Sequence, residues 1–215
     1  MSIEKHPSPS LLVSYASGLI PRAPALIIIS HLEACPACRA KVALLEEAGG
    51  QLMDSMAPAP LSADAFDRLM ARIDTEGPVR HDRLGSAGSE MLGDVLLPPA
   101  VVELGVEPRR WMGPGLWTAH LHLPPQDNWR AFVLRAPAGQ RIPRHRHVGH
   151  ELISVLQGAF REGLQYEAGE FQESGPESAH GQEVTPEGAC ACLIAVQGEI
   201  EWRGMARMIR PMLGI

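Results

Sequence analysis

The chain has 215 residues, enough for two small domains that each bury a modest core. Its formal net charge is -6, with 8 basic and 11 acidic residues in positions 1–90 and 11 and 14 in positions 91–215. Neither half is basic enough to favour direct binding to nucleic acid. No stretch approaches the roughly 20 apolar residues that cross a bilayer, and no signal-peptide pattern is visible. We therefore expect a cytoplasmic protein with no membrane partner, whose four cysteines stay reduced.

Residues 1–76 have the apolar periodicity of a small all-α domain. The pattern predicts a first helix over residues 11–19 and a second over 24–32. A third helix is expected to start at Pro36, because proline is well tolerated in the first helical turn. A fourth is expected after Ser62, a residue type that caps helix N-termini.

The composition and the apolar pattern of the sequence change after this helical segment. Residues 77–90 are rich in Gly, Ser and Pro, with no apolar period, and are interpreted as a linker. Residues 91–215 contain short apolar runs separated by Pro and Gly turns, which is typical of an all-β sandwich or barrel. The most distinct of these runs are 117–123, 130–135, 152–156 and 191–196.

A first group of candidate metal ligands lies in the helical segment, where His31 is followed by Cys35 and Cys38 in an HxxxCxxC pattern. Pro36 cannot continue the preceding helix but can open the next one, so Cys35 should sit at a helix start, where backbone N–H groups favour a thiolate. His31 then approaches from the end of the previous helix. A structural zinc site needs four ligands, and His6 is the only other His or Cys before His31.

Two other interpretations of the CxxC remain open from the residues alone. A thioredoxin-like redox pair would need a βαβ context, which is absent from this segment. The cysteines could also be buried core residues with no ligand role. The full pattern, matched by His6, His31, Cys35 and Cys38, resembles the zinc-binding anti-sigma factors of bacteria. That resemblance implies a zinc-stapled helical bundle that wraps a sigma factor and blocks its contact with RNA polymerase.

A second group of candidate ligands lies in the β segment and consists of His145, His147, Glu151 and His180. His145 and His147 are two residues apart, so on a strand they point to the same face. Glu151 follows after a short turn, and His180 comes from a later strand. Three imidazoles and a carboxylate suit Zn, Mn, Fe, Ni or Cu, and affinity alone does not select among them.

The spacing of these side chains resembles the cupin motifs. The first motif is matched throughout, from Gly139 through the three ligands at 145, 147 and 151 to Gly158. The second motif is partial: Gly169 and His180 fit, but Val184 stands where many cupins have Asn. The resemblance implies a jelly-roll barrel over about residues 91–200. It supports His180 as a ligand less firmly than the other three.

The combination of the two modules resembles the ChrR-type anti-sigma factors over nearly the whole chain. This implies that the N-terminal domain holds an extracytoplasmic-function-type sigma factor in a 1:1 complex, with zinc at the N-terminal site. It also implies that the cupin, with a second divalent metal that we expect to be zinc, is needed for release under oxidative stress, notably singlet oxygen. The alternative function is a cupin metalloenzyme, a dioxygenase or isomerase, with an accessory zinc domain.

We further expect an exposed apolar partner surface on the helices and two metal sites that work separately. The helices carry more apolar surface than so small a domain can bury, notably 26–29 with Leu52, Met53 and Met56, and we expect these residues to form the partner surface. We also expect the two metal sites to function separately, because they share no ligand and a linker joins their domains.

The remaining cysteines and histidines of the β segment are not expected to be ligands. Cys190 and Cys192 lie two apart on an expected strand, about 7 Å from each other and too far for a bond, and are interpreted as inert core residues. If they face the barrel interior near the metal, they become candidates for oxidation instead. His120 and His122 are expected to line a rim, and His150 to lie on the surface.

Overall fold

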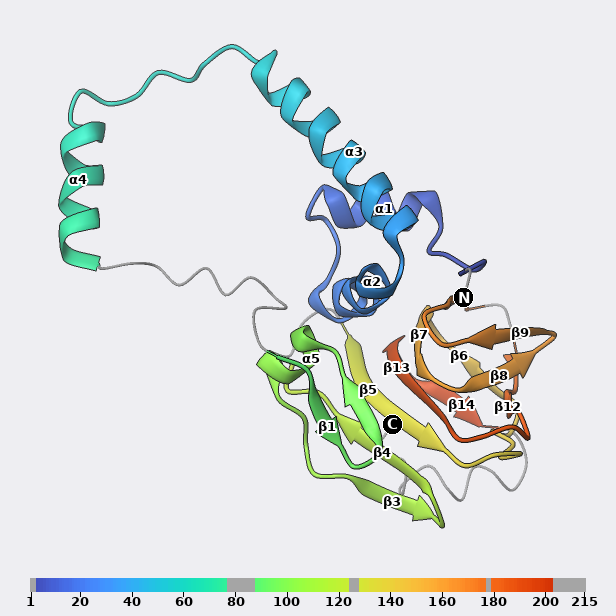
Figure 1. Cartoon of the computed structure of the whole chain (residues 1–215). Helices are drawn as coiled ribbons and strands as arrows, with labels where there is room; N and C mark the ends of the chain where they lie inside the picture. The colour runs from blue at the N-terminus through green and yellow to red at the C-terminus, as the bar shows by residue number, and fades with distance from the viewer. Residues whose placement is uncertain (1–2, 77–87, 124–127, 177–178, 203–215) are drawn as a thin grey trace.

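The computed structural model describes residues 3–76, 88–123, 128–176 and 179–202, and has a helical N-terminal part and a β-rich C-terminal part (Figure 1). The first part contains the four expected helices: α1 (Pro9–Ala16), α2 (Arg22–Ala34), α3 (Pro36–Asp54) and α4 (Ala65–Glu76). Helix α2 begins two residues earlier than predicted. Its proline at position 24 is tolerated because the first helical N–H groups have no intrahelical acceptor. Residues 77–87, most of the expected linker, lie outside the described residues.

The C-terminal part is an all-β domain with one short helix, α5 (Pro99–Leu104), that the sequence pattern did not predict. Its strands are β1 (Glu90–Leu92), β2 (Val95–Leu97), β3 (Arg110–Gly113), β4 (Leu116–His120), β5 (Trp129–Ala136), β6 (His145–His147), β7 (Glu151–Gln157), β8 (Ala159–Glu162), β9 (Leu164–Glu167), β10 (Phe171–Ser174), β11 (Ala179–His180), β12 (Glu183–Val184), β13 (Cys190–Gln197) and β14 (Ile200–Trp202).

The strands form a barrel around an apolar interior. A six-stranded antiparallel sheet has the order β10-β7-β13-β5-β4-β3, and two three-stranded sheets have the orders β11-β6-β14 and β12-β8-β9. Side chains from the large sheet and from both small sheets share one inner cluster, which includes Ile153, Phe160, Val184 and Ile200. The predicted combination of a helical bundle and an all-β barrel is confirmed.

Strand β13 explains why the large sheet is buried on both faces. Successive side chains of a strand point to opposite sides, and here both sides are apolar. The inward set belongs to the inner cluster and the outward set belongs to a second cluster shared with the helices. The inward residues are Cys190, Cys192, Ile194 and Val196, and the outward residues are Ala191, Leu193 and Ala195.

Helix α2 covers the outer face of this sheet, where the small outward side chains of β13 leave room for it (Figure 1). Its residues Leu26, Ile27 and Ile28 are fully buried in the cluster that also contains Leu193. The expectation that the 26–29 stretch belongs to an exposed partner surface is therefore wrong. An apolar helix face can be covered by another domain of the same chain as readily as by a partner, and here the barrel covers it.

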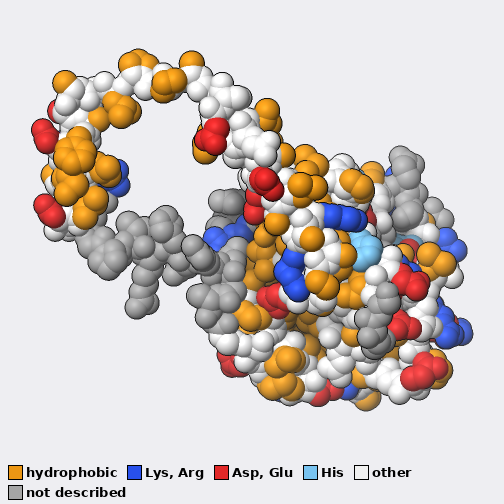
Figure 2. All heavy atoms as spheres, turned by 45° about the horizontal axis from the view of Figure 1, so that its top comes forward, with side chains coloured by type: hydrophobic (Ala, Val, Ile, Leu, Met, Phe, Trp, Pro, Cys, Tyr) orange, Lys and Arg blue, Asp and Glu red, His pale blue; other side chains and the backbone are white. Residues whose placement is uncertain are grey.

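Apolar side chains at the C-terminal end of α3, just after it, and along α4 remain exposed. Leu52, Met53 and Met56 are about 70% exposed, as the surface expectation requires. Helix α4 stands clear of the other helices and of the barrel, and apolar side chains gather on it (Figures 1 and 2). These side chains recur at helical spacing and are all exposed: Phe66, Leu69, Met70 and Ile73. No helix within the described ranges is long and apolar enough to span a membrane.

Two candidate metal centres

The N-terminal candidate metal site is the group formed by His6, His31, Cys35 and Cys38, whose potential ligand atoms all lie within 4.8 Å of one another. His31 comes from the last turns of α2, and the two cysteines flank the start of α3. The Cys35 sulfur accepts the backbone N–H of Cys38 at 3.5 Å, so it caps α3 as the sequence predicted. His6 reaches the group from the extended segment before α1.

The separations inside this group fit a tetrahedral metal. His6 Nδ1 lies 3.5 Å from the sulfur of Cys35 and 3.4 Å from that of Cys38, and His31 Nε2 lies 3.4 Å from the sulfur of Cys38. Tetrahedral bonds of about 2.3 Å to sulfur and 2.0 Å to nitrogen place such atoms about 3.5 Å apart. Two sulfurs and two imidazole nitrogens are also a donor set typical of zinc.

Contacts with the barrel set the orientation and the protonation state of His31. His31 is fully buried, and its Nδ1 donates to the carbonyl oxygen of Gly169, in the turn before β10, at 2.8 Å. With the proton on Nδ1, the lone pair of Nε2 faces the sulfurs. Burial lowers the pKa of His31 to about 4, against the smaller opposing effect of the Gly169 hydrogen bond, so the ring is neutral near pH 7.

The thiol of Cys38 needs a nearby cation to ionise near neutral pH. Burial and the neighbouring Cys35 raise the pKa of Cys38 to about 11. Two adjacent buried thiols would therefore not both become thiolates unless a positive charge lay between them. The donor geometry and this electrostatic setting agree in pointing to a bound cation.

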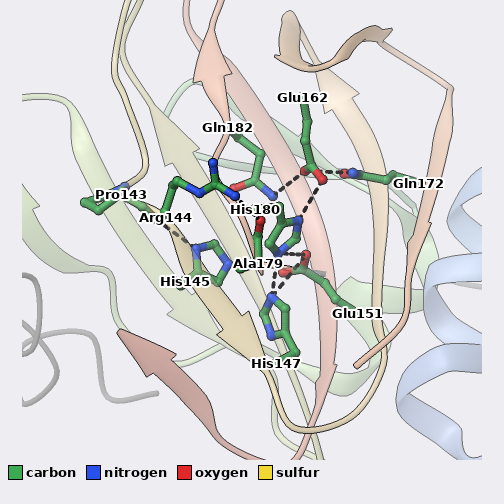
Figure 3. A network of polar contacts seen from close by, with 10 residues as sticks. All are labelled: Pro143, Arg144, His145, His147, Glu151, Glu162, Gln172, Ala179, His180 and Gln182. Carbon is green, nitrogen blue, oxygen red and sulfur yellow. Dashed lines mark hydrogen bonds and ion pairs between the residues drawn. The ribbon is translucent and has the colours of Figure 1, made fainter. Parts of the chain in front are cut away.

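The barrel candidate metal site is the group formed by His145, His147, Glu151 and His180 (Figure 3). The first two residues are the ends of β6, Glu151 begins β7, and His180 ends β11 directly opposite His145 in the register. All four side chains are buried and point toward one another inside the barrel (Figure 3).

The separations in the barrel site also fit a metal. The Nε2 atoms of His147 and His180 lie 2.9 Å apart, and each lies 3.4 Å from Glu151 Oε2. These distances bracket the roughly 3.3 Å between ligands that bond a tetrahedral zinc at 2.0–2.1 Å. Glu151 Oε2 is buried and has no hydrogen-bond donor among the described residues. Such an oxygen is costly to bury unless a cation satisfies it.

Outer contacts orient the histidines of the barrel site. His145 Nδ1 lies 3.0 Å from the Pro143 carbonyl oxygen, a contact that places the proton on Nδ1 and orients the ring in the site. His180 Nδ1 lies 2.8 Å from Glu162 Oε1, the carboxylate–histidine arrangement that often supports metal ligands. Burial would lower the pKa of His180, but the hydrogen bond to Glu162 and the charges of Glu151 and Glu162 outweigh it and raise the pKa.

Comparisons with known proteins identify the family. Residues 99–199 match the family model described as the ChrR cupin-like domain. The chain is 31% identical over 219 aligned residues, covering all of both chains, to the anti-sigma-E factor ChrR of Cereibacter sphaeroides. The chain belongs to the ChrR family of anti-sigma factors. In the crystal structure of Rhodobacter sphaeroides SigE in complex with the anti-sigma ChrR, the matching chain is 32% identical, with a TM-score of 0.73 over 91% of this chain and 100% of that chain.

A cavity of about 230 Å³ lies inside this ChrR-type cupin barrel, with His145 and Glu151 in its wall. Its other lining is largely apolar. Among the described lining residues, the ionisable side chains beyond the candidate ligands are Arg141, Cys190 and Cys192. The cavity thus offers no second carboxylate or imidazole as a general base.

The two cysteines of β13 lie closer together than their spacing suggested. Their sulfurs are 3.7 Å apart, whereas the sequence led us to expect about 7 Å and well-separated side chains. The pairing of β13 with β7 shifts register between residues 191 and 192, where Leu156 of β7 is the extra residue. The Cys190 side chain and burial hold the pKa of Cys192 well above its usual value, so this thiol stays protonated.

Sequence reasoning missed the outer contacts of both sites. Glu162, which supports His180, also accepts Gln172 Nε2 at 2.8 Å and Gln182 Nε2 at 3.1 Å (Figure 3). Glu162 is one of several acidic residues in the β8–β9 hairpin, and nothing in the sequence distinguishes it as the one that supports His180. The Gly169 carbonyl is a backbone group, so the sequence gives no sign that it accepts a hydrogen bond. Gly169 itself stands out only because it fits the second cupin motif. His120 lies against Phe132 rather than among the candidate ligands.

Proposed function

We propose that this protein is an anti-sigma factor that binds a sigma factor of RNA polymerase one to one and keeps it from the polymerase. The observation that carries the proposal is the similarity to the anti-sigma-E factor ChrR over the full length of both chains. The match to ChrR in its complex with SigE supports the same kind of partner. This homology supports a regulator rather than an enzyme.

The surface proposed for the sigma factor is the exposed apolar face of α3 and α4. It is defined by Leu52 and Met53 at the end of α3, by Met56 just after that helix, and by Phe66, Leu69, Met70 and Ile73 on α4. An amphipathic helix such as α4, with its apolar stripe uncovered, is of the kind that lies in a partner's groove. The net negative charge of residues 1–90 complements the basic surface that a sigma factor presents to DNA.

The proposed division of labour follows the two metal sites. Residues 1–76 form the sigma-binding domain with zinc held by His6, His31, Cys35 and Cys38; residues 77–90 are a linker; and residues 91–215 form the cupin. A second divalent metal, also zinc, is held there by His145, His147, Glu151 and His180. Zinc bound only by the folded state stabilises it, and this matters most for a helical part with so little core of its own. The protein is proposed to act in the cytoplasm.

The cupin is proposed to release the sigma factor under oxidative stress such as singlet oxygen. His147→Ala should remove the barrel metal and leave the N-terminal one. Cells carrying this variant should still silence a sigma-dependent reporter without stress, and should fail to activate it under photosensitised singlet oxygen. A variant that responds like wild type would remove the barrel metal from the sensing step.

Co-purification tests the proposed function directly. The chain would be co-expressed in turn with each extracytoplasmic-function sigma factor of its native cell, and the mass of any complex measured by light scattering after gel filtration. We expect one of these sigma factors to give a stable 1:1 complex. Failure of all of them to bind at micromolar concentration would contradict the proposal.

A further inference from the structure

The segment Gly169–Gln172, which forms the turn before β10 and its first two residues, lies between the two metal sites. Phe171 and Gln172 are neighbours on a strand, so their side chains point to opposite faces. Phe171 packs outward, with its ring 5.6 Å from the ring of His31. Gln172 is buried and reaches Glu162, beside His180 of the barrel site (Figure 3).

On its outer side the segment positions both histidines of the N-terminal site. The Gly169 carbonyl accepts the Nδ1 proton of His31 at 2.8 Å. The backbone N–H of Phe171 donates to the carbonyl of Lys5, the residue just before His6, at 3.1 Å. The carboxylate of Glu170 accepts Lys5 Nζ at 3.0 Å. Three consecutive barrel residues therefore hold the ring of one histidine and the backbone that leads to the other.

The packing at Gly169 is tight on this side. Its φ is +88°, and a Cβ placed there would lie 3.0 Å from Ile3 Cδ1 and 3.3 Å from Ala34 Cβ. Ile3 belongs to the segment that carries His6, and Ala34 lies between His31 and Cys35. The turn thus touches both pieces of chain that supply ligands.

On its inner side the segment supports the barrel site through one further residue. Gln172 Nε2 donates to Glu162 Oε2 at 2.8 Å, and Glu162 Oε1 lies 2.8 Å from His180 Nδ1. Gln182 Nε2 donates to the same Oε2 at 3.1 Å, but it comes from the segment between β11 and β12 and not from β10. Of the two amides that donate to Glu162, only that of Gln172 therefore connects His180 to the segment on the outer face of the barrel.

We propose that Gly169–Gln172 positions ligands of both metal sites, so that metal occupancy in the barrel tightens the hold of the N-terminal site on its own metal. The proposal rests on the two metal sites of the proposed function. Metal in the barrel fixes His180, which fixes Glu162 and Gln172, and this keeps the Gly169 carbonyl under His31. Outer contacts of this kind change metal affinity by roughly 10- to 100-fold. The coupling must be reciprocal, because it is a difference in binding free energy.

Cobalt loaded into the full-length chain gives a readout specific to the N-terminal site, because only that site has thiolate ligands and thiolate-to-cobalt absorption. The rate at which this band decays in excess chelator would be compared for wild type, Gly169→Ala and Gly163→Ala. Gly163 has a similar φ of +68° in the neighbouring turn, but no atom within 4 Å of an added Cβ. We expect Gly169→Ala to lose cobalt at least about tenfold faster than wild type, and Gly163→Ala to match wild type.

Three further variants, none of which alters an N-terminal ligand, test the link to the barrel metal. His147→Ala, which removes a barrel ligand, and Gln172→Leu, which breaks the link, should each speed cobalt loss from the N-terminal site several-fold, with no additive effect in the double variant. Gln182→Leu removes the other donor to Glu162 and should leave the rate unchanged. Wild-type rates in Gly169→Ala and Gln172→Leu would overturn the proposal. A wild-type chain without the thiolate-to-cobalt band would instead refute the N-terminal metal site itself.

Discussion

The imidazole of His31, in the helical part, donates from Nδ1 to the carbonyl oxygen of Gly169, in the barrel, at 2.8 Å. The hydrogen bond joins a candidate metal ligand to a domain that holds a different candidate metal site. It lies beside the apolar cluster in which α2 packs on the outer face of the barrel sheet. The two parts therefore share a core and a polar contact, although the sequence led us to expect sites that function separately.

Replacing the cysteines of the N-terminal site should remove one metal from the chain. Wild type should carry two metals per chain by elemental analysis, and Cys35→Ser/Cys38→Ser should carry one. The variant should also lose about 4 kcal/mol of unfolding free energy when free metal is a thousandfold above its dissociation constant, because a ligand that binds only the folded state stabilises it.

Cys190→Ser/Cys192→Ser is the matched control for that experiment. It also replaces a close pair of buried thiols, 3.7 Å apart, but one that belongs to neither candidate ligand group. It should keep both metals. Two metals per chain in the Cys35→Ser/Cys38→Ser variant would show that the HxxxCxxC group is not a metal site.

Truncating the apolar face of α4 should weaken binding to the sigma factor without affecting the fold. Phe66 and Ile73 are 70% and 58% exposed, so Phe66→Ala/Ile73→Ala leaves no cavity and should keep the melting temperature of wild type. If each of these two apolar contacts contributes about 1 kcal/mol to binding, the dissociation constant should rise at least about tenfold when both are lost. Leu164→Ala, at an equally exposed apolar residue on β9, should bind like wild type. Equal affinities for the two variants would exclude α4 from the interface.

A fragment of residues 1–90 should behave as an incomplete unit. Without the barrel it exposes Leu26, Ile27 and Ile28, which are fully buried in the whole chain. We expect the fragment to bind a hydrophobic dye and to self-associate unless a separate 91–215 fragment is added. A monomeric fragment that binds no dye would mean that these residues are covered within the helical part itself.

Acid should loosen the contact between the N-terminal segment and the barrel. Burial alone would raise the pKa of Glu170, but hydrogen bonds from the backbone of Glu167 and Glu4 and from Lys5 outweigh it and hold the pKa below 4.5. A carboxylate with a lowered folded pKa stabilises the protein above its unfolded pKa, and that contribution is lost as pH falls through the folded value. Glu170→Gln should therefore be less stable than wild type at pH 7, and the difference should shrink below about pH 4.5. Melting temperatures from pH 3 to 7 measure this, with exposed Glu201→Gln as control. A constant difference would contradict it.

The sequence predicted which residues form the two candidate metal sites, because most of these residues lie close together along the chain. His31, Cys35 and Cys38 span two turns of chain at a helix junction, and His145 and His147 occupy one face of one strand. The alternation of short apolar runs likewise predicted the barrel strands.

The contacts between the two parts could not be predicted in the same way. An apolar run such as 26–29 has the same sequence signature whether it meets a partner or another domain. A backbone acceptor such as the Gly169 carbonyl has no residue-type signal. The choice of Glu162 over other acids as the support for His180 depends on the register between distant strands. The close approach of the sulfurs of Cys190 and Cys192 depends on how the two side chains are oriented, which the i, i+2 spacing does not reveal.

The central claim is that this chain inhibits a sigma factor through its helical part. Reconstituted transcription from a promoter of that sigma factor, with purified core polymerase and increasing amounts of the full-length chain, tests it most directly. We expect near-complete inhibition at a 1:1 ratio of chain to sigma factor, with Phe66→Ala/Ile73→Ala needing about tenfold more protein at concentrations near the dissociation constant. Undiminished transcription at an equimolar or severalfold higher amount of the wild-type chain would contradict it.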